Sequence, residues 1–308
     1  VANIQLTNQD DGFEGDLTLY GDSNIQNYND ILEGINGNDR LYGDRGRDRL
    51  RGGRGDDRLY GGVDDDSLWG GIGNDDLYGE QDDDTLYGDE GNDRLAGGEG
   101  ADLLIGGIGD DTYILDDELD TIDDQGSHGD IDTVVVRGNI SSYVLSSGID
   151  NASLEGTQAV QLTGNGTGNV LTGNSNDNTL DGAEGDDTAA FQGSIDEYEI
   201  TASSAGSVTV KDKLASRDGT DTLKNIESLS FKGSKVPVSQ AIDGITGITT
   251  HTGGTGNQII LAASDDIINF SAPTFSELRT TPISGFDPAN DIMSLDRTTF
   301  VGISSNSL

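Results

Sequence analysis

The chain has 308 residues, with 57 acidic and 17 basic side chains and a formal net charge of -40 at pH 7. So acidic a surface is a poor partner for nucleic acid, and it destabilises a compact state unless cations offset the repulsion. The absence of cysteine excludes disulfides and zinc–thiolate sites, and no apolar run is long enough to predict insertion into a membrane.

The N-terminal segment, residues 1–33, is acidic. Its end overlaps the stretch NYNDILEG, from Asn27 to Gly34, which resembles half of a repeat. Asp30 and Leu32 stand there at the same spacing as the aspartates and leucines that follow. We therefore expect this segment to start the repeat fold.

Nine tandem blocks of nine residues run without a gap from Gly34 to Ile114. Position one is always Gly, and position eight is Leu in every block except the last, which has Tyr113. Position six is always Asp: Asp39, Asp48, Asp57, Asp66, Asp75, Asp84, Asp93, Asp102 and Asp111. Position four is Asp64 and Asp82 in two blocks and Gly in the others: Gly37, Gly46, Gly55, Gly73, Gly91, Gly100 and Gly109.

This spacing suits a calcium-binding turn. Glycine permits the left-handed backbone of a tight turn and leaves carbonyls free to approach an ion, and aspartate supplies the hard anionic oxygen that calcium prefers. Position eight should point inward, because side chains alternate along a strand. We expect a six-residue turn and a three-residue strand in each block, with the position-four and position-six residues binding calcium.

The blocks resemble the RTX (repeats-in-toxin) nonapeptide GGxGxDxUx, in which U is a large apolar residue. The resemblance implies an all-β fold: a right-handed parallel β-roll whose ions sit between turns of successive coils. Nine blocks would then hold about seven ions or more. Residues 34–114 contain 21 acidic and eight basic residues, and about seven Ca²⁺ ions would nearly neutralise the difference. A disordered glycine–aspartate linker would have no reason to keep leucine at every ninth position.

A degenerate second run of repeats follows the first. We assign residues 34–125 to the calcium-binding roll and residues 126–187 to a second solenoid segment. Asn169 and Asn178 replace aspartate at position six there, which weakens the prediction of calcium binding, whereas Asp187 restores it and is a further candidate ligand. The acids between the two runs, from Asp116 to Asp132, either bind another ion or are solvated turn residues.

The remaining chain changes in character. Residues 188–235 alternate apolar and polar residues as half-buried antiparallel strands do, and they resemble a β module that follows RTX repeats and caps the open end of the roll. Residues 236–308 resemble the C-terminal cap and uncleaved signal region of proteins exported by a type I secretion apparatus. This agrees with the start of the chain, which lacks the basic and apolar regions of an N-terminal signal peptide.

The sequence contains no HExxH, GxSxG or Walker motif, so we predict that the chain is not an enzyme and has no catalytic residues. The favoured hypothesis is a secreted, extracellular or cell-surface structural protein that needs calcium to fold and to self-associate, head-to-tail or laterally, into a filament, sheath or surface layer. An alternative is the folding and secretion module of a larger secreted enzyme or toxin. A weaker alternative is a module that binds surface polysaccharide through outward rows of aromatic residues.

Overall fold

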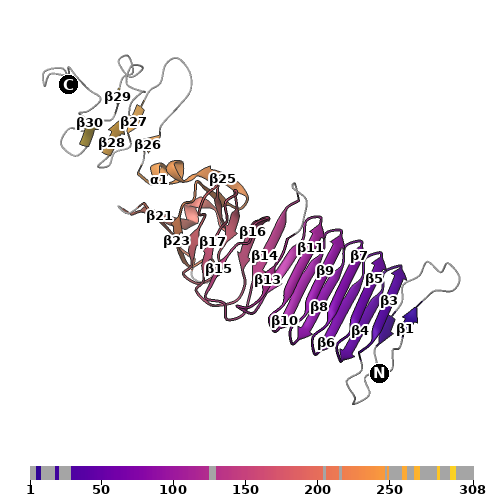
Figure 1. Ribbon diagram of the computed structural model, residues 1–308. Helices are drawn as coiled ribbons and strands as arrows, with labels where there is room; N and C mark the ends of the chain where they lie inside the picture. Colours follow the sequence, from indigo (N-terminus) through magenta and orange to yellow (C-terminus); the bar gives the residue numbers. More distant parts are fainter. Residues whose placement is uncertain are drawn as a thin grey trace. The chain divides into compact units, whose positions relative to one another are not determined.

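The computed structural model describes residues 5–7, 18–20, 29–124, 130–203, 206–214, 217–246, 248–249, 259–261, 267–270, 283–284 and 292–295. The chain divides into two compact units, Val1–Lys235 and Val236–Leu308, which are taken in turn. The first unit is a parallel β-solenoid, in which strands of successive coils lie side by side (Figure 1).

Successive strands of the repeats alternate between two parallel sheets, so each pairs with the strand two places along the chain. One sheet holds β1 (Gln5–Thr7), β3 (Ile31–Asn36), β5 (Arg49–Arg54), β7 (Ser67–Ile72), β9 (Thr85–Glu90), β11 (Leu103–Ile108) and β13 (Thr121–Ile122). The other holds β2 (Thr18–Tyr20), β4 (Arg40–Arg45), β6 (Arg58–Val63), β8 (Asp76–Gln81), β10 (Arg94–Glu99), β12 (Thr112–Leu115), β14 (Asp132–Val136), β16 (Ile149–Leu154), β18 (Val170–Thr172), β20 (Thr188–Phe191), β24 (Ser228–Phe231) and β25 (Ser234–Pro237). Leu50 pairs with Leu68, 18 residues on, so two blocks make one coil.

The strands of the roll are longer than the sequence predicts. From β4 to β11 each strand has six residues and only three remain for the turn, so the expected three-residue strand and six-residue turn were wrong. The reason is that pairing resumes after position one: Gly53 pairs with Gly71 and Arg54 with Ile72. Gly53 has a φ of 114°, and a Cβ on it would lie 2.8 Å from the carbonyl carbon of Ile35, so glycine allows this close pairing.

The core of the roll is a column of leucines from position eight. Tyr113 takes the same place in the last block, and its hydroxyl accepts a hydrogen bond from the Gly106 N–H at 3.1 Å. All are fully buried: Leu32, Leu41, Leu50, Leu59, Leu68, Leu77, Leu86, Leu95, Leu104 and Tyr113. A buried leucine contributes about 1.5–3 kcal/mol of hydrophobic free energy relative to an exposed one, so this column is the main apolar contribution to folding.

A third sheet follows the second run of repeats and contains the antiparallel part of the fold. Its order is β15 (Ser142–Val144), β17 (Gln161–Thr163), β19 (Thr179–Asp181), β23 (Thr220–Lys224), β22 (Val208–Asp212) and β21 (Tyr198–Ala202). β19 pairs with β23 in parallel, whereas β21 and β22, and β22 and β23, are antiparallel. The predicted all-β fold class, a parallel β-solenoid followed by a smaller antiparallel region, is confirmed.

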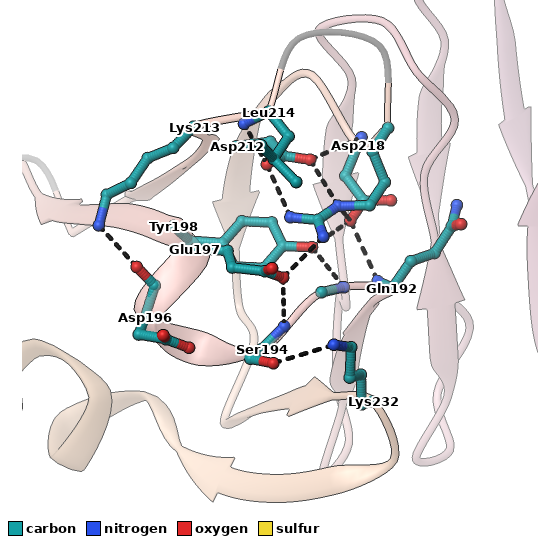
Figure 2. Close-up of polar contacts among 12 residues, drawn as sticks. Gln192, Ser194, Asp196, Glu197, Tyr198, Asp212, Lys213, Leu214, Asp218 and Lys232 are labelled. Carbon is teal, nitrogen blue, oxygen red and sulfur yellow. Dashed lines mark hydrogen bonds and ion pairs between the residues drawn. The ribbon is translucent and has the colours of Figure 1, made fainter.

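The antiparallel region is held by a network of charged and polar side chains (Figure 2). Arg217 donates two hydrogen bonds to the Asp212 carboxylate, at 2.8 and 2.7 Å, and a third to Glu197 at 2.7 Å. The Tyr198 hydroxyl donates to Asp218 and accepts from the Gly193 N–H. These contacts link η1 (Ile195–Glu197), β21 and β22 to the loop before β23.

The second unit is described mainly by its backbone. It contains α1 (Val238–Thr246), followed by β26 (Ile248–Thr249), β27 (Ile259–Leu261), β28 (Ile267–Phe270), β29 (Ile283–Ser284) and β30 (Ile292–Leu295). β27 pairs with β26 and β29, and β28 pairs with β30. Within the described part of the chain no helix is both long and apolar enough to cross a membrane. Most of the region predicted to carry the secretion signal lies outside the described residues.

Candidate metal centre

The position-six aspartates form two ladders, one along each edge of the roll. From Asp48 onward, the Oδ1 atom of each accepts a hydrogen bond from the backbone N–H of the aspartate 18 places earlier. The acceptors, at 2.6–2.8 Å, are Asp48, Asp57, Asp66, Asp75, Asp84, Asp93, Asp102 and Asp111. One carboxylate oxygen of each residue is therefore used by the backbone of the neighbouring coil.

The second oxygen of each carboxylate is buried and has no hydrogen-bond partner among the described residues. These Oδ2 atoms belong to Asp48, Asp57, Asp66, Asp75, Asp84, Asp93, Asp102, Asp111, Asp187 and Asp221. All ten residues are 2 % exposed or less. Asp39, which belongs to the ladder of Asp57, is as deeply buried. A buried carboxylate oxygen that meets neither a donor nor a cation costs free energy, so these atoms fit a cation.

Burial shifts the titration of these carboxyl groups. Desolvation raises the pKa of Asp66 to about 9, and that of Asp84 and Asp93 to about 8. The hydrogen bond that each accepts from the neighbouring backbone opposes the shift without cancelling it. Without a cation, Asp66, Asp84 and Asp93 would therefore hold protons at neutral pH.

Position-one glycines leave room beside the free oxygens. A Cβ added to Gly43 would lie 2.6 Å from Asp48 Oδ2 and 2.5 Å from the carbonyl oxygen of Gly61 in the next coil. Gly61 has the same surroundings, with Asp66 Oδ2 at 2.5 Å and the Gly79 carbonyl oxygen at 2.8 Å. A carboxylate oxygen and a carbonyl oxygen from successive coils thus converge on several position-one glycines, namely Gly34, Gly43, Gly61, Gly79 and Gly88.

The position-four residues adopt the left-handed conformation that the turn needs. Their φ angles lie between 108° and 153° at Gly37, Gly46, Gly55, Gly73, Gly91, Gly100 and Gly109. Asp64 and Asp82 keep positive φ values, 79° and 72°, in the two blocks that lack the glycine. Position four therefore shapes the turn in all nine blocks.

The donor set fits calcium. The described residues contain no group of three or more carboxylate or imidazole side chains that could hold a metal by themselves. Calcium takes about six to eight oxygen ligands and readily accepts backbone carbonyls. Asp Oδ2 atoms and turn carbonyls would hold the ion, which would supply the positive charge that the buried carboxylates need.

Comparison with protein families agrees with this geometry. The model of the RTX calcium-binding nonapeptide repeat matches four times, at residues 26–59, 51–86, 87–122 and 162–190. The chain therefore contains RTX calcium-binding nonapeptide repeats. RTX repeats bind calcium and are typical of secreted proteins. No curated protein matches the chain.

The Asp ladders extend beyond the tandem blocks that the sequence shows. Asp30 donates its N–H to Asp48 at 2.6 Å, in register with the first run. At the other end of the first run, Asp120 accepts from the Asp102 N–H at 3.2 Å and Asp132 from the Asp111 N–H at 2.9 Å. The second of these steps spans 21 residues, which conceals the repeat from a nine-residue search.

In the second run, Asn169 completes the hydrogen bonding at its position in the ladder without a metal. The Asn169 side-chain amide nitrogen donates to the carbonyl oxygens of Ile149 at 2.9 Å and Asp150 at 3.2 Å. The backbone N–H of Asn169 still donates to Asp187 Oδ1 at 2.7 Å. An amide donor therefore satisfies carbonyls at a position where the first run has only carboxylate oxygens.

The outward rows of aromatic residues are packed against one another. Tyr20, Tyr42, Tyr60 and Tyr78 stack with ring centroids 4.8–5.0 Å apart, and Arg94 lies over the last ring. On the other sheet Trp69 stacks on Tyr87 at 5.4 Å and is covered by Arg51. Most ring faces are therefore occupied by neighbouring rings or by guanidinium groups.

Proposed function

We propose that this protein is a secreted structural protein that folds in extracellular calcium and then assembles with copies of itself outside the cell or at its surface. The observation that carries the proposal is the double ladder of buried carboxylates. Free energy of metal binding becomes free energy of folding when the unfolded chain has no site. In a calcium-poor cytosol the mutually repelling acids favour an open chain that suits a type I secretion apparatus.

The charge distribution supports self-association. All seven arginines of the first coils are exposed: Arg40, Arg45, Arg47, Arg49, Arg51, Arg54 and Arg58. Three make ion pairs within the described part of the chain, namely Arg47 with Asp65, Arg51 with Glu33 and Arg58 with Asp76. The other four face solvent in an otherwise acidic protein. A solenoid has two different ends, so contacts between unlike ends propagate unless the assembly closes.

An apolar contribution to a lateral contact is available on one sheet. The outward residues at positions seven and nine of this sheet are largely packed: Trp69, Tyr87 and Leu103 are half-buried and Ile105 is only 8 % exposed. Ile72 and Ile108, which stand at position three of their blocks and on the same sheet, are 41 % and 56 % exposed. These two residues are the better candidates for an apolar contact between copies.

Sedimentation velocity in millimolar calcium and in chelator tests the proposal, with circular dichroism on the same samples. We expect large assemblies with calcium and a dissociated, largely unfolded chain without it. Changing Arg45, Arg47 and Arg54 together to Glu should dissolve the assemblies while the β spectrum persists. The matched control changes Lys211, Lys224 and Lys235 to Glu, which gives the same change in charge at exposed positions of the antiparallel region.

A wild-type protein that is folded, calcium-loaded and monomeric at high concentration would contradict the assembly part of the proposal. That result would favour the folding and secretion module of a larger secreted enzyme or toxin. Binding of surface polysaccharide is less well supported, because a sugar stacks on an aromatic face and neighbours cover most of these faces.

A further inference from the structure

The last coil of the solenoid is interrupted by the antiparallel strands. After β20 the chain leaves the coil, forms β21 and β22, and returns as β23, which pairs with β19 in parallel. Leu180 pairs with Leu223, and both are buried. The return strand therefore continues the leucine column, although it lies 43 residues further along the chain and not 18.

Asp221 stands where the position-six aspartate of this interrupted coil belongs. Its Oδ1 accepts a hydrogen bond from the Asn178 N–H at 2.9 Å, and the Thr222 N–H donates to the Asn178 carbonyl at 2.9 Å. In the first run the Asp39 N–H donates to Asp57 Oδ1 at 2.7 Å, and the Arg58 N–H to the Asp39 carbonyl at 2.9 Å. The same pair of hydrogen bonds thus joins the antiparallel region to the last repeat.

The side chain of Asp221 is fully buried, and its Oδ2 meets no hydrogen-bond partner in the part of the chain that the structure describes. Gly173 occupies position one of the block that contains Asn178. A Cβ on Gly173 would lie 2.8 Å from Asn178 Oδ1 and 3.2 Å from Asp221 Oδ2. An anionic oxygen and an amide oxygen therefore converge on this glycine, as two oxygens do at Gly43.

Asn169 provides the contrasting case on the other edge. Its amide nitrogen donates to the carbonyls of Ile149 and Asp150, and these carbonyl oxygens therefore have a donor without an ion. The amide nitrogen of Asn178 is buried and has no hydrogen-bond partner among the described residues. It donates no hydrogen bond to Asp221, so the buried Asp221 carboxylate lacks the positive partner that it needs.

We propose that a calcium ion binds between Asn178 and Asp221 and fastens the antiparallel region to the end of the roll. Asp221 Oδ2 and Asn178 Oδ1 are its side-chain ligands. The site lies across a 43-residue separation and uses an aspartate outside every repeat that the family model matches. The proposal does not depend on self-assembly, since it concerns one site within a single chain.

Calcium counting on the full-length chain tests this site. Asp221→Asn keeps an oxygen to accept the Asn178 N–H but removes the charge, and we expect it to bind one calcium ion fewer than the wild type. Asp186→Asn is the matched control, because Asp186 is an exposed aspartate of the adjacent second run and its loss should leave the count unchanged. A folded Asp221→Asn variant with the wild-type count would overturn the proposal.

A second measurement covers the case in which the variant does not fold. Terbium can replace calcium in the wild-type protein, and its anomalous scattering locates each ion in a crystal. We expect a peak at about 2.3–2.6 Å from Asp221 Oδ2, the usual distance for a calcium ligand. A map with peaks along the first run and none beside Asp221 would refute the site while leaving calcium binding by the repeats intact.

Discussion

Replacing Asp75 separates the two tasks of a position-six aspartate. Asp75 Oδ1 accepts the Asp57 N–H at 2.7 Å, and its Oδ2 is buried beside Gly70 with no hydrogen-bond partner from the described residues. Asp75→Asn keeps an acceptor for the Asp57 N–H and removes the negative charge. Asp75→Ala removes both, so the difference between the variants isolates the hydrogen bond from the metal site.

The expected magnitudes follow from this division. A site at a free calcium concentration 100 times its Kd stabilises the fold by about 2.7 kcal/mol, so Asp75→Asn should lose about that much in calcium. Asp75→Ala should lose roughly a further 1–3 kcal/mol, because the buried Asp57 N–H is left without an acceptor. In chelator the sign for Asp75→Asn should reverse, since the buried Asp75 carboxyl must then either take up a proton or carry an uncompensated charge, and the neutral amide does neither.

Guanidinium unfolding followed by circular dichroism, with calcium and with chelator, measures these differences, and calorimetry counts the ions. Asp56→Asn is the matched control. Asp56 is an exposed neighbour in a column that already contains Asn38, Asn74 and Asn92, and its Oδ1 accepts the Asn74 N–H at 3.0 Å. Equal destabilisation by Asp75→Asn in calcium and in chelator would refute the reasoning, because the carboxylate would then act only through structure.

Three further predictions follow from the same ladders and from the network of Figure 2. Burial raises the pKa of Asp48 and Asp57 to about 7 and of Asp66 to about 9, above the ordinary 3.8. Protonation of these carboxyl groups therefore stabilises the calcium-free roll fully below about pH 4, and this stabilisation is lost as the pH rises through about 7 to 9. A pH titration in chelator should show β structure in acid that disappears in base. Asn169→Asp should add one calcium ion per chain, measured by calorimetry. An unchanged count would show that the Asn169 amide does not take the place of a calcium ion. Arg217→Ala should lower the thermal midpoint of the antiparallel region by the same amount with and without calcium, whereas Lys213→Ala, which loses one exposed hydrogen bond, should not.

The repeat fold was predictable because period and chemistry coincide. Leucine at position eight and aspartate at position six recur every nine residues, and the structure buries both. The strand length was not predictable from that pattern, because it depends on pairing that resumes at positions two and three. Asp132 and Asp221 were missed as ladder members because 21 and 43 residues, not 18, separate them from their partners. A signal for Asp221 does exist: DGTDTL keeps glycine, aspartate and leucine at positions four, six and eight.

The two carboxylate oxygens explain why this fold couples so closely to calcium. Oδ1 completes the backbone hydrogen bonding of the neighbouring coil, so an aspartate cannot be removed without exposing a buried N–H. Oδ2 has no donor among the described residues, so ionising the same aspartate in place without a cation costs free energy. A chain with such residues along both edges must therefore bind calcium, bind protons or unfold. Beyond the first run, Asn169 and the Arg217 network complete their hydrogen bonds without metal, whereas Asp187 and Asp221 keep a buried oxygen without a donor among the described residues. Loss of calcium should consequently unfold the first coils before the region that Asn169 and Arg217 hold.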